Sequence, residues 1–431
     1  MESPADPVRA RLLSDALAIA RSLDHLDLDA ALARRLEAVG HADPYGGPVD
    51  LVAVGKAAPE LVRAARRALG ERVARVLAVG EAPAEGVLVG DHPRPGARSL
   101  AAGATLIEFL EAGGASDLTL FVVSGGASSL AVAPVAPVTV EDVAALFVAA
   151  SSRGADVVTL NRLRAAVSWL GGGAVLEHAR THESLALVLV DVAVGGAPWV
   201  GSALTYDYRP DDAEVESLLE AVGLAATPLA ARVRAAAAAR RSALGPHPHH
   251  VNLVLLEPGD WRAAALAEAA RLGYATLDLG AIEGPPERLA AGVAAALEAT
   301  RDRPLCVLGV GEATPVLGAH PGRGGRGQEW CATVAPALAR AGRPVLALGY
   351  ASDGADHEAG VGGAWSDDTT VTRAREAGLD LAEALVAHDT HAPHAALGQL
   401  LAGGHTGWNL CDLYLVVAGP STPSAQNSPP T

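Results

Sequence analysis

The sequence is poor in three kinds of residue, and each shortage excludes something. Aromatic residues make up 3% of the 431 positions, so the core must be mainly aliphatic. The three cysteines, Cys306, Cys331 and Cys411, are widely spaced and odd in number, which argues against a disulfide framework and against a Cys-x-x-Cys metal site. We expect them to be buried thiols. Lysine occurs only once, as Lys56, although arginine is common.

Positive charge and long apolar runs are also in short supply. The formal net charge of −16 argues against a nucleic-acid partner, because phosphate backbones bind to basic surfaces. No run approaches the roughly 20 apolar residues needed to cross a bilayer. Residues 1–22 lack the uninterrupted apolar region of a signal peptide. We therefore expect a cytoplasmic protein, monomeric or homodimeric and without a membrane partner, that acts on a small anionic molecule.

What the chain does contain is an alternation of short apolar runs with longer Ala/Leu/Arg segments of helical spacing. The apolar runs are continuous, as in strands that are buried on both faces of a parallel sheet. Such alternation predicts an α/β protein with doubly wound sheets. The predicted strands are 49–55, 75–80, 118–126, 185–192, 251–256, 304–311, 344–352 and 413–417.

Length and loop composition predict two domains. At 431 residues the chain is longer than one compact core usually requires. A long helical pattern over 211–241 is followed by "GPHPHH" at 245–250, which is a break marked by Gly and Pro. The predicted boundaries are 1–244 for an N-terminal domain, 245–420 for a C-terminal domain and 421–431 for a disordered, low-complexity tail.

Lys56 follows the first predicted strand in "VDLVAVGKAAPELV" and precedes a helical pattern. Ligands of doubly wound sheets bind at the carboxyl ends of the strands, where the start of the next helix favours anions. An ammonium group on a flexible stem is not interchangeable with a planar guanidinium group at a crowded reacting centre. Because arginine is used nearly everywhere else, we interpret Lys56 as a functional residue at an anion site.

Two further glycine-rich stretches at strand ends carry anion-binding chemistry. "VVSGGASSL" (122–130) offers backbone N–H groups and hydroxyl groups to a phosphate or carboxylate. "GEATPVLGAHPGRGGRGQE" (311–329) has a glutamate at a strand end and two arginines in a loop suited to gripping an anion. This loop fits neither the Walker pattern nor a dinucleotide fingerprint. The candidate binding residues of the two stretches are Ser124, Gly125, Gly126, Ser128, Glu312, Arg323 and Arg326.

Two stretches nearer the C-terminus complete the set of candidates. After the strand at 344–352, Asp353 is placed to bind Mg²⁺ or to orient a hydroxyl group. Most of the other acidic residues up to 368, among them Asp356 and Asp367, are interpreted as a solvated acidic loop. "GGHTGWNLCDL" (403–413) is a turn that offers Asn409 to a ligand.

Taken in order, these stretches resemble the motifs of type II glycerate kinases, the family with a C-terminal MOFRL domain. "VGKAA" is similar to the family's lysine segment, and "DHPRPG" (91–96) to its HPxPD turn. "VVSGGASSL" resembles its SGGGSALL loop, and "LNRLRAAVSWLGGG" (160–173) its INxVRxxLSxxKGG helix. The glycine-rich arginine loop, the acidic stretch after it and the final turn match in the same order. The resemblance covers roughly residues 10–418.

The resemblance implies two Rossmann-like α/β domains with an active-site cleft between them. It also implies transfer of the γ-phosphoryl group of ATP to the 2-hydroxyl group of D-glycerate with Mg²⁺, a reaction that depends on charge neutralisation and alignment. Lys56 and Arg326 match the lysine and arginine implicated in catalysis. Asp191 and Asp353 match carboxylates that bind metal or orient the hydroxyl group, Asp191 also being a catalytic candidate. Substrate- or phosphate-binding candidates from the helix motif are Asn161 and Arg164.

The sequence departs from the family's motifs at several polar positions. A Gly-Asp-Asp segment is replaced by Val194-Gly195-Gly196, and the lysine of the KGG turn by Gly171. Three hypotheses follow: a kinase for glycerate or another hydroxy acid, a member that uses Lys56 for another reaction (as general base, Schiff-base amine or anion anchor), or a non-catalytic binding protein. A reductase is disfavoured, because no GxGxxG follows a strand.

Overall fold

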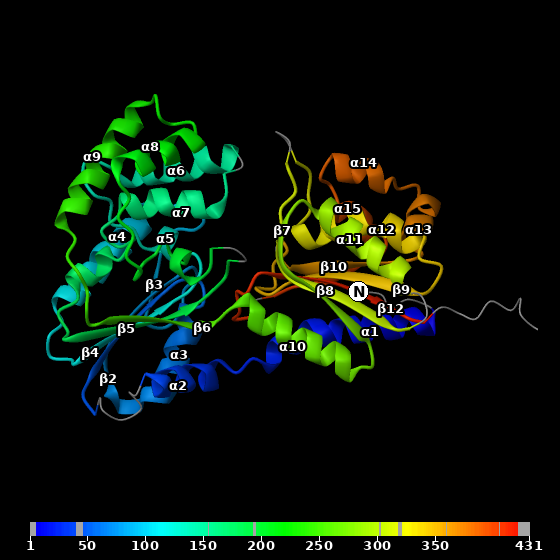
Figure 1. Cartoon of the computed structure of the whole chain (residues 1–431), viewed down its shortest axis with the longest axis horizontal. Helices are drawn as coiled ribbons and strands as arrows, with labels where there is room; N and C mark the ends of the chain where they lie inside the picture. Colours follow the sequence, from blue (N-terminus) through cyan, green and yellow to red (C-terminus); the bar gives the residue numbers. More distant parts are fainter. Residues whose placement is uncertain are drawn as a thin grey trace, which may run out of the picture. The chain divides into compact units, whose positions relative to one another are not determined.

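The structure is a computed structural model that describes residues 6–39, 46–153, 155–192, 195–300, 303–317, 321–358, 360–404 and 406–420. It divides into two compact units (Figure 1). Unit 1 comprises Met1–Leu26 and Pro258–Thr431, and unit 2 comprises Asp27–Glu257. The chain therefore begins in unit 1, builds the whole of unit 2 and then returns to complete unit 1.

This division differs from the domain boundaries expected from the sequence. The boundary expected after residue 244 lies inside unit 2, because β6 (His250–Leu256) pairs in parallel with β5 (Glu183–Leu189). The first residues were expected in the N-terminal domain, but α1 (Pro7–Ala20) contacts strands of unit 1 and buries Leu12 and Leu13. The proposed tail at 421–431 lies outside the described residues.

In the described residues of unit 2, six strands form one sheet in the order β3-β2-β1-β4-β5-β6. Every neighbouring pair is parallel, so the doubly wound arrangement is confirmed here. The central strands β1 and β4 are buried along their whole length, which is why they are continuous apolar runs in the sequence. The other strand bounds are β1 (Val49–Val54), β2 (Val73–Gly80), β3 (Val87–Val89) and β4 (Leu118–Val123).

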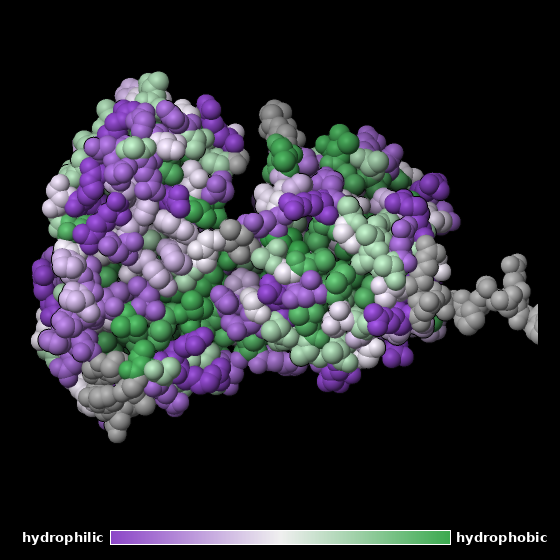
Figure 2. Space-filling view, viewed as in Figure 1, coloured by the Kyte–Doolittle hydropathy of each residue, from purple (hydrophilic) through white to green (hydrophobic). Residues whose placement is uncertain are grey.

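Helices cover both faces of this sheet (Figure 1). One face carries α2 (Leu28–Ala38) and α3 (Ala58–Leu69), and the other carries α4 (Ala97–Glu111) with α5 (Ala127–Leu130). Val52 and Val54 of β1 share a core cluster with Leu106 of α4. The remaining helices α6, α7, α8 and α9 enclose a second apolar cluster, and hydrophilic residues prevail over α8 and α9 on the face shown in Figure 2. Their bounds are α6 (Val140–Ser152), α7 (Val157–Ala166), α8 (Asp212–Ala221) and α9 (Pro228–Ala243), with short 3-10 helices η2 (Gly70–Arg72), η3 (Ala174–His178) and η4 (Ala197–Trp199).

The single long helix expected over 211–241 is two helices, α8 and α9. Gly223 adopts a φ of +67° just after α8, which ends the first helix. Pro228 then occupies the first position of α9, where its missing N–H group costs nothing. The apolar spacing in the sequence continues across this turn, because both helices bury apolar residues in the same cluster.

The sheet of unit 1 is mixed. Its order among the described residues is β11-β10-β9-β12-β8-β7, and β12 (Asp412–Ala418) runs antiparallel to both β8 (Leu305–Ala313) and β9 (Val345–Ala351). The α/β class is confirmed, but the strand directions differ from the parallel arrangement that the apolar runs suggested. Helices on both faces bury β12 completely, so a central antiparallel strand looks the same in sequence as a parallel one. The other strands are β7 (Ala275–Gly284), β10 (Val361–Asp367) and β11 (Leu400–Ala402).

In unit 1, α1 and α10 (Pro258–Arg271) lie on one face of the sheet, and α11 (Pro286–Ala299) and α12 (Arg326–Ala339) on the other (Figure 1). Trp261 of α10 is completely buried and its indole N–H donates to the Ala20 carbonyl group at 3.1 Å. The remaining helices are η1 (Arg21–His25), α13 (Thr370–Glu376), α14 (Leu381–Val386) and α15 (His391–Ala396). All three cysteine side chains are buried. Of the described helices, none combines the length and apolarity needed to span a bilayer.

Candidate active site

In unit 2 the strand order reverses between β1 and β4, and the loops that follow these two strands meet at that point. Ligands of open parallel sheets bind at such a switch point, outside the carboxyl ends of the strands. The Lys56 N–H group donates to the Gly125 carbonyl group at 2.8 Å, and the Ala57 N–H group donates to Ser124 Oγ at 3.1 Å. The loop after β1 is therefore fastened to the loop after β4 by one backbone–backbone hydrogen bond and one bond to a serine hydroxyl group.

Lys56 is half-buried beside Gly126 and His92. Gly126 has a φ of +81°, and a Cβ atom built on it would lie 3.3 Å from both Lys56 Cγ and His92 Cδ2. A side chain at position 126 would therefore be strained and would crowd the lysine stem. Within the described parts of the chain, Lys56 has no carboxylate partner. Thus no described carboxylate pairs with its ammonium charge.

The four candidates in the loop after β4 do not share one role. Ser124 is completely buried and accepts the Ala57 N–H group, and Gly125 is also buried. These two residues join the two loops. Gly126 and Ser128 are half-buried and reach the surface.

His92 was not among the residues predicted from the sequence. Its Nδ1 atom lies 3.2 Å from a carboxylate oxygen of Glu81. Its ring lies on the same side of Gly126 as the Lys56 stem, since a Cβ atom on that glycine would be 3.3 Å from both. The available signal was the "DHPRPG" turn, which the family resemblance included but which was not interpreted as part of the site. The structure places this turn beside the lysine, with the Ser129 hydroxyl group donating to the Pro93 carbonyl group at 2.9 Å.

Asn161 and Arg164 both lie on α7 and are buried, but only one is fully engaged. The Asn161 side-chain amide donates to the Trp199 carbonyl group at 3.0 Å and accepts the Ser202 hydroxyl group at 3.0 Å. This residue therefore fastens the segment around η4. Arg164 has a single hydrogen bond, from Nη1 to Ser128 Oγ at 3.3 Å, and its Nε and Nη2 atoms have no partner in the described residues.

Asp191 follows β5, which is the neighbour of β4, and therefore lies at the carboxyl edge of the same sheet. It is half-buried and makes a polar or electrostatic interaction within the protein. Of the segment that replaces the family's two aspartates, Val194 lies outside the described residues. Gly195 is described, and a Cβ atom on it would lie 2.7 Å from the Trp199 ring.

In unit 1, Arg326 is the first residue of α12 and is bound by two carboxylates. Its Nε atom donates to Asp412 at 2.8 Å, and its Nη1 atom lies 2.8 Å from Glu312. Burial acts to lower the pKa of Arg326, but Asp412 and Glu312 outweigh it and raise the pKa above its ordinary value. The arginine is thus a fixed cation whose charge the protein itself offsets.

Asp412 was missed in the sequence, and it is a central residue of this cluster. Complete burial raises its pKa to about 7, although Arg326 acts in the opposite direction. The Tyr414 hydroxyl group donates to the same carboxylate at 3.2 Å. Because β12 is antiparallel to its neighbours, its first residue lies at the carboxyl ends of β8 and β9, opposite Gly311 and Ala351.

Asp356 occupies the anion-binding position that the glycine-rich arginine loop was expected to offer to a ligand. Its carboxylate accepts the backbone N–H groups of Gly327 at 2.9 Å and Gln328 at 3.0 Å, in the first turn of α12. Burial nevertheless raises the pKa of Asp356, against the effect of these hydrogen bonds. The start of this helix is therefore capped by the protein's own carboxylate.

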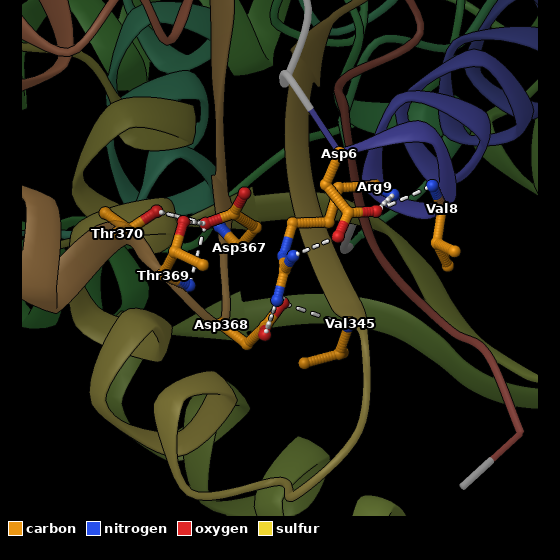
Figure 3. Close-up of polar contacts among 8 residues, drawn as sticks. All are labelled: Asp6, Val8, Arg9, Val345, Asp367, Asp368, Thr369 and Thr370. Carbon is orange, nitrogen blue, oxygen red and sulfur yellow. Dashed lines mark hydrogen bonds and ion pairs between the residues drawn. The ribbon is translucent and has the colours of Figure 1, made fainter. Parts of the chain in front are cut away.

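The interpretation of the acidic stretch as a solvated loop is wrong for several of its residues. Asp356 and Asp367 are buried, and Asp367 accepts the Thr369 hydroxyl group at 2.7 Å (Figure 3). Asp368 binds Arg9 of α1 through two hydrogen bonds, of 3.0 Å from Nε and 2.6 Å from Nη2. Asp368 and Asp356 bind partners from distant parts of the chain and so help to hold unit 1 together. Asp367 instead binds the neighbouring Thr369 and Thr370.

The remaining candidates of unit 1 are less enclosed. Arg323 is mostly exposed, with its Nε and Nη2 atoms donating to Glu358 at 3.2 and 2.9 Å. Asp353 is half-buried directly after β9, and one oxygen accepts the Ala355 N–H group at 2.9 Å. Asn409 is half-buried in a loop held to the same segment, where Leu410 N–H donates to Ser352 Oγ at 2.7 Å.

The described residues contain no group of three or more His, Cys, Asp or Glu side chains arranged to hold a metal ion. Magnesium in kinase sites is held by one or two carboxylates together with the phosphates of the substrate. A single carboxylate such as that of Asp353 is compatible with that mode of binding. The described residues do not provide a metal site built only of protein ligands.

Comparison with known families and proteins agrees with this organisation. Residues 15–237 match a family described as Domain of unknown function (DUF4147), and residues 305–412 match the MOFRL family. A crystal structure of glycerate kinase from Thermotoga maritima has the same fold, with a TM-score of 0.79 at 23% identity over 95% of this chain and 99% of that one.

Curated relatives carry two kinds of name. A mouse protein named glycerate kinase is 30% identical over 383 residues, which cover 76% of this chain and 72% of the relative. An Agrobacterium vitis protein named putative hydroxypyruvate reductase is 28% identical over 341 residues, 77% of each chain. The family matches, the relatives and the ordered motifs agree: this chain belongs to the type II glycerate kinase family.

Proposed function

We propose that this protein transfers the γ-phosphoryl group of ATP to a hydroxyl group of a small hydroxy acid, D-glycerate being the first candidate. The observation that carries the proposal is Lys56, an ammonium group at the switch point of a parallel sheet with no carboxylate partner among the described residues. The names of the kinase relatives support the same reaction class.

Lys56 has the properties that phosphoryl transfer requires. The reaction involves little covalent chemistry from the protein, and its cost lies in the charge spread over the phosphoryl oxygens. A positioned cation stabilises that charge where it develops. We assign Lys56 the role of neutralising the transferred phosphoryl group, with Gly126 leaving room for its approach.

Arg326 is proposed as a second catalytic cation, by resemblance to the family's arginine. Its Nε and Nη1 atoms are bound to Asp412 and Glu312, so these two carboxylates fix the direction of the guanidinium group. Glu312 is thereby assigned to positioning rather than to contact with substrate. Asp191 is proposed to orient the acceptor hydroxyl group, and Asn409 and Arg323 to contact the ligand.

Magnesium is proposed to enter with the nucleotide. When bound, it would offset the negative charge of the phosphate groups, and the carboxylate of Asp353 or of Asp191 would help to hold it. No step depends on a site made only of protein ligands. Removal of Mg²⁺ with a chelator is therefore expected to abolish transfer without unfolding the protein.

Two other functions remain as competing hypotheses. A family member without kinase activity, using Lys56 as a general base, Schiff-base amine or anion anchor, is favoured by the loss of the carboxylates at Gly195 and Gly196. A reductase is suggested by the name of one relative. Against it, the loop after β1 reads "VGKAAP" and lacks the glycines that let a dinucleotide pyrophosphate approach.

One set of assays separates these functions. ADP release from Mg-ATP is measured with D-glycerate, L-lactate and tartrate, and NADH oxidation is measured with hydroxypyruvate. The kinase proposal expects acid-dependent ADP release and no NADH oxidation. It is overturned if Mg-ATP at millimolar concentration gives neither calorimetric binding nor ADP release with any of the acids.

A further inference from the structure

Arg164 of unit 2 is a buried cation that the protein does not satisfy. It is 7% exposed, and its guanidinium carbon lies 5.4 Å from the centre of the Phe147 ring. Burial lowers its pKa to about 10, so it remains charged at neutral pH. Its Nε and Nη2 atoms have no hydrogen-bond partner among the described residues. A buried charge in this condition is destabilising unless something else compensates it.

Arg240 of α9 provides an internal comparison. It is even more deeply buried, at 1% exposure, and it also has no ion-pair partner among the described residues. However, its three nitrogens donate to four backbone carbonyl groups at 2.6–3.0 Å, so it is fully used in holding the structure together. The accepting residues are Ser168, Tyr208, Gly171 and Gly172. Arg164 has no such set of acceptors, so its burial has a different explanation.

The unpartnered edge of Arg164 is the edge with which this protein binds carboxylates. In Arg9, Nε and Nη2 together hold the two oxygens of Asp368, as Figure 3 shows. The same pair of atoms in Arg232 holds both oxygens of Asp142, and in Arg323 both oxygens of Glu358. This side-on fork matches the geometry of a carboxylate group.

A small cavity adjoins Arg164. Its volume is about 20 Å³, slightly more than the roughly 10–15 Å³ needed for one water molecule. Its walls are Arg164, three serines and aliphatic or glycine residues, with no acidic side chain among them. Two of the serines, Ser128 and Ser168, each accept a hydrogen bond through Oγ, and so their own O–H groups remain available to donate.

Because position 171 is a glycine and not a lysine, Arg164 is the one cationic side chain among the described residues that line the cavity. A Cβ atom on this glycine would lie 2.9 Å from the Ser202 carbonyl oxygen and 3.0 Å from the Ala165 Cα atom. A lysine, which the family motif has at this position, therefore does not fit on this backbone without a shift. One guanidinium group with two hydroxyl donors suits a singly charged anion better than a doubly charged one.

The cavity is connected through α5 to the Lys56 site. Ser128, which lines the cavity, lies two residues after Gly126, where an added Cβ atom would lie 3.3 Å from Lys56 Cγ. The cavity therefore adjoins the loop after β4, to which the loop that carries Lys56 is fastened.

We propose that this cavity is the subsite for the carboxylate group of the acceptor acid, held by the Nε/Nη2 edge of Arg164 and by the hydroxyl groups of Ser128 and Ser168. This inference rests on the proposed function and adds to it the residues that bind the carboxylate group of the acceptor. Arg164 is then a binding residue, and its lack of internal partners is what the carboxylate satisfies.

The test is binding of D-glycerate, L-lactate and the uncharged amide of glycerate, by calorimetry without ATP, to the wild type, Arg164→Gln and Arg164→Lys. We expect Arg164→Gln to weaken binding of at least one acid by about 30- to 100-fold, and Arg164→Lys to weaken it less, because a charge remains without the fork. The amide should bind weakly and equally to all three proteins.

Thermal unfolding distinguishes a binding role from a structural one. Arg164→Gln removes an uncompensated buried charge and should leave the melting temperature unchanged or higher. Arg240→Gln, the control, should lower it, because four carbonyl groups lose their donor. A fall in Arg164→Gln as large as in the control overturns the proposal.

The proposal is also overturned if Arg164→Gln binds the acids as tightly as the wild type does, or if the wild type binds the amide and the acid equally. It is overturned as well if Arg164→Gln loses the binding of chloride but not of the acids, which would identify a halide site. Because these measurements contain no ATP, they are independent of phosphoryl transfer. Acid binding that requires Arg164 without ADP release would contradict the proposed kinase activity and leave the subsite standing.

Discussion

In unit 2 the two candidate cations, Lys56 and Arg164, have no carboxylate partner among the described residues, whereas in unit 1 Arg326 is bound by Asp412 and Glu312. The N-terminus of α12 in unit 1 is likewise already capped, by Asp356. Unit 2 can therefore receive a negative charge without first giving up an internal ion pair. A cation that the protein leaves uncompensated is a better guide to anion binding than an arginine-rich loop.

The comparison is tested first by removing one cation from each unit. Lys56→Ala is expected to lower kcat by about 10³-fold, because it removes the charge that stabilises the transferred group. Arg271→Ala in unit 1, whose partner is Glu268 and whose side chain is 67% exposed, should change kcat by less than about 3-fold. ADP-release kinetics measure both. Equal losses in the two variants would remove the distinction between the units.

The second test removes the compensated cation. Arg326→Gln leaves Asp412 and Glu312 without their counter-charge; because the arginine side chain is 39% exposed, solvent should limit the cost to about 1–3 kcal/mol of unfolding free energy. Denaturant unfolding measures the loss, with Lys56→Ala as the control that should stay within about 0.5 kcal/mol of the wild type. If Arg326→Gln is as stable as this control, the arginine does not compensate the negative charges of Asp412 and Glu312.

The third test uses pH. Because the pKa of Asp412 is raised to about 7, the folded protein keeps a proton that the unfolded chain releases above about pH 4. The unfolding free energy should therefore fall as the pH rises from about 4 to 7, by at most about 4 kcal/mol from this group. Asp412→Asn, which cannot lose that proton, should flatten the curve. An identical slope in the variant and the wild type would exclude this assignment.

The smallest effect concerns the attachment of α1 within unit 1. Arg9→Gln removes the bidentate bond to Asp368, in which both side chains are about four-fifths buried, and should cost about 1–2 kcal/mol. Arg11→Gln is the matched control, since Arg11 is 78% exposed and lies 3.7 Å from Asp15. Hydrogen exchange in α1 should increase in the first variant and not in the second. Equal exchange in both would mean that this ion pair does not hold the helix.

The sequence predicted the strands that are long and apolar, because burial on both faces leaves a continuous run. It did not reveal β10, whose residues are "VGGAWSD", since glycine, serine and aspartate are unusual in strands and only the packing of neighbours makes them one. Nor did it reveal strand direction. A run such as Leu413–Val417 is equally apolar whether its neighbours are parallel or antiparallel.

The same limit explains which site residues were found. Lys56 was identified because its rarity and its position after a strand are both local features. Asp412 was not, because only the antiparallel direction of β12 brings the start of that strand to the ends of β8 and β9. Asp356 accepts the N–H group of Gln328, 28 residues earlier in the chain. The cavity beside Arg164 is lined by residues from several separate segments between 128 and 204. Such relationships depend on the fold and have no local pattern.

The most direct measurement of the central claim is the kinetics of Lys56→Arg with Mg-ATP and D-glycerate, followed by ADP release. Arginine preserves the positive charge but replaces the compact ammonium group with a planar guanidinium group beside Gly126 and His92. We predict that kcat falls at least about 100-fold while the protein remains folded. Full activity of Lys56→Arg would contradict the account, because the one lysine of the chain would then have no special function.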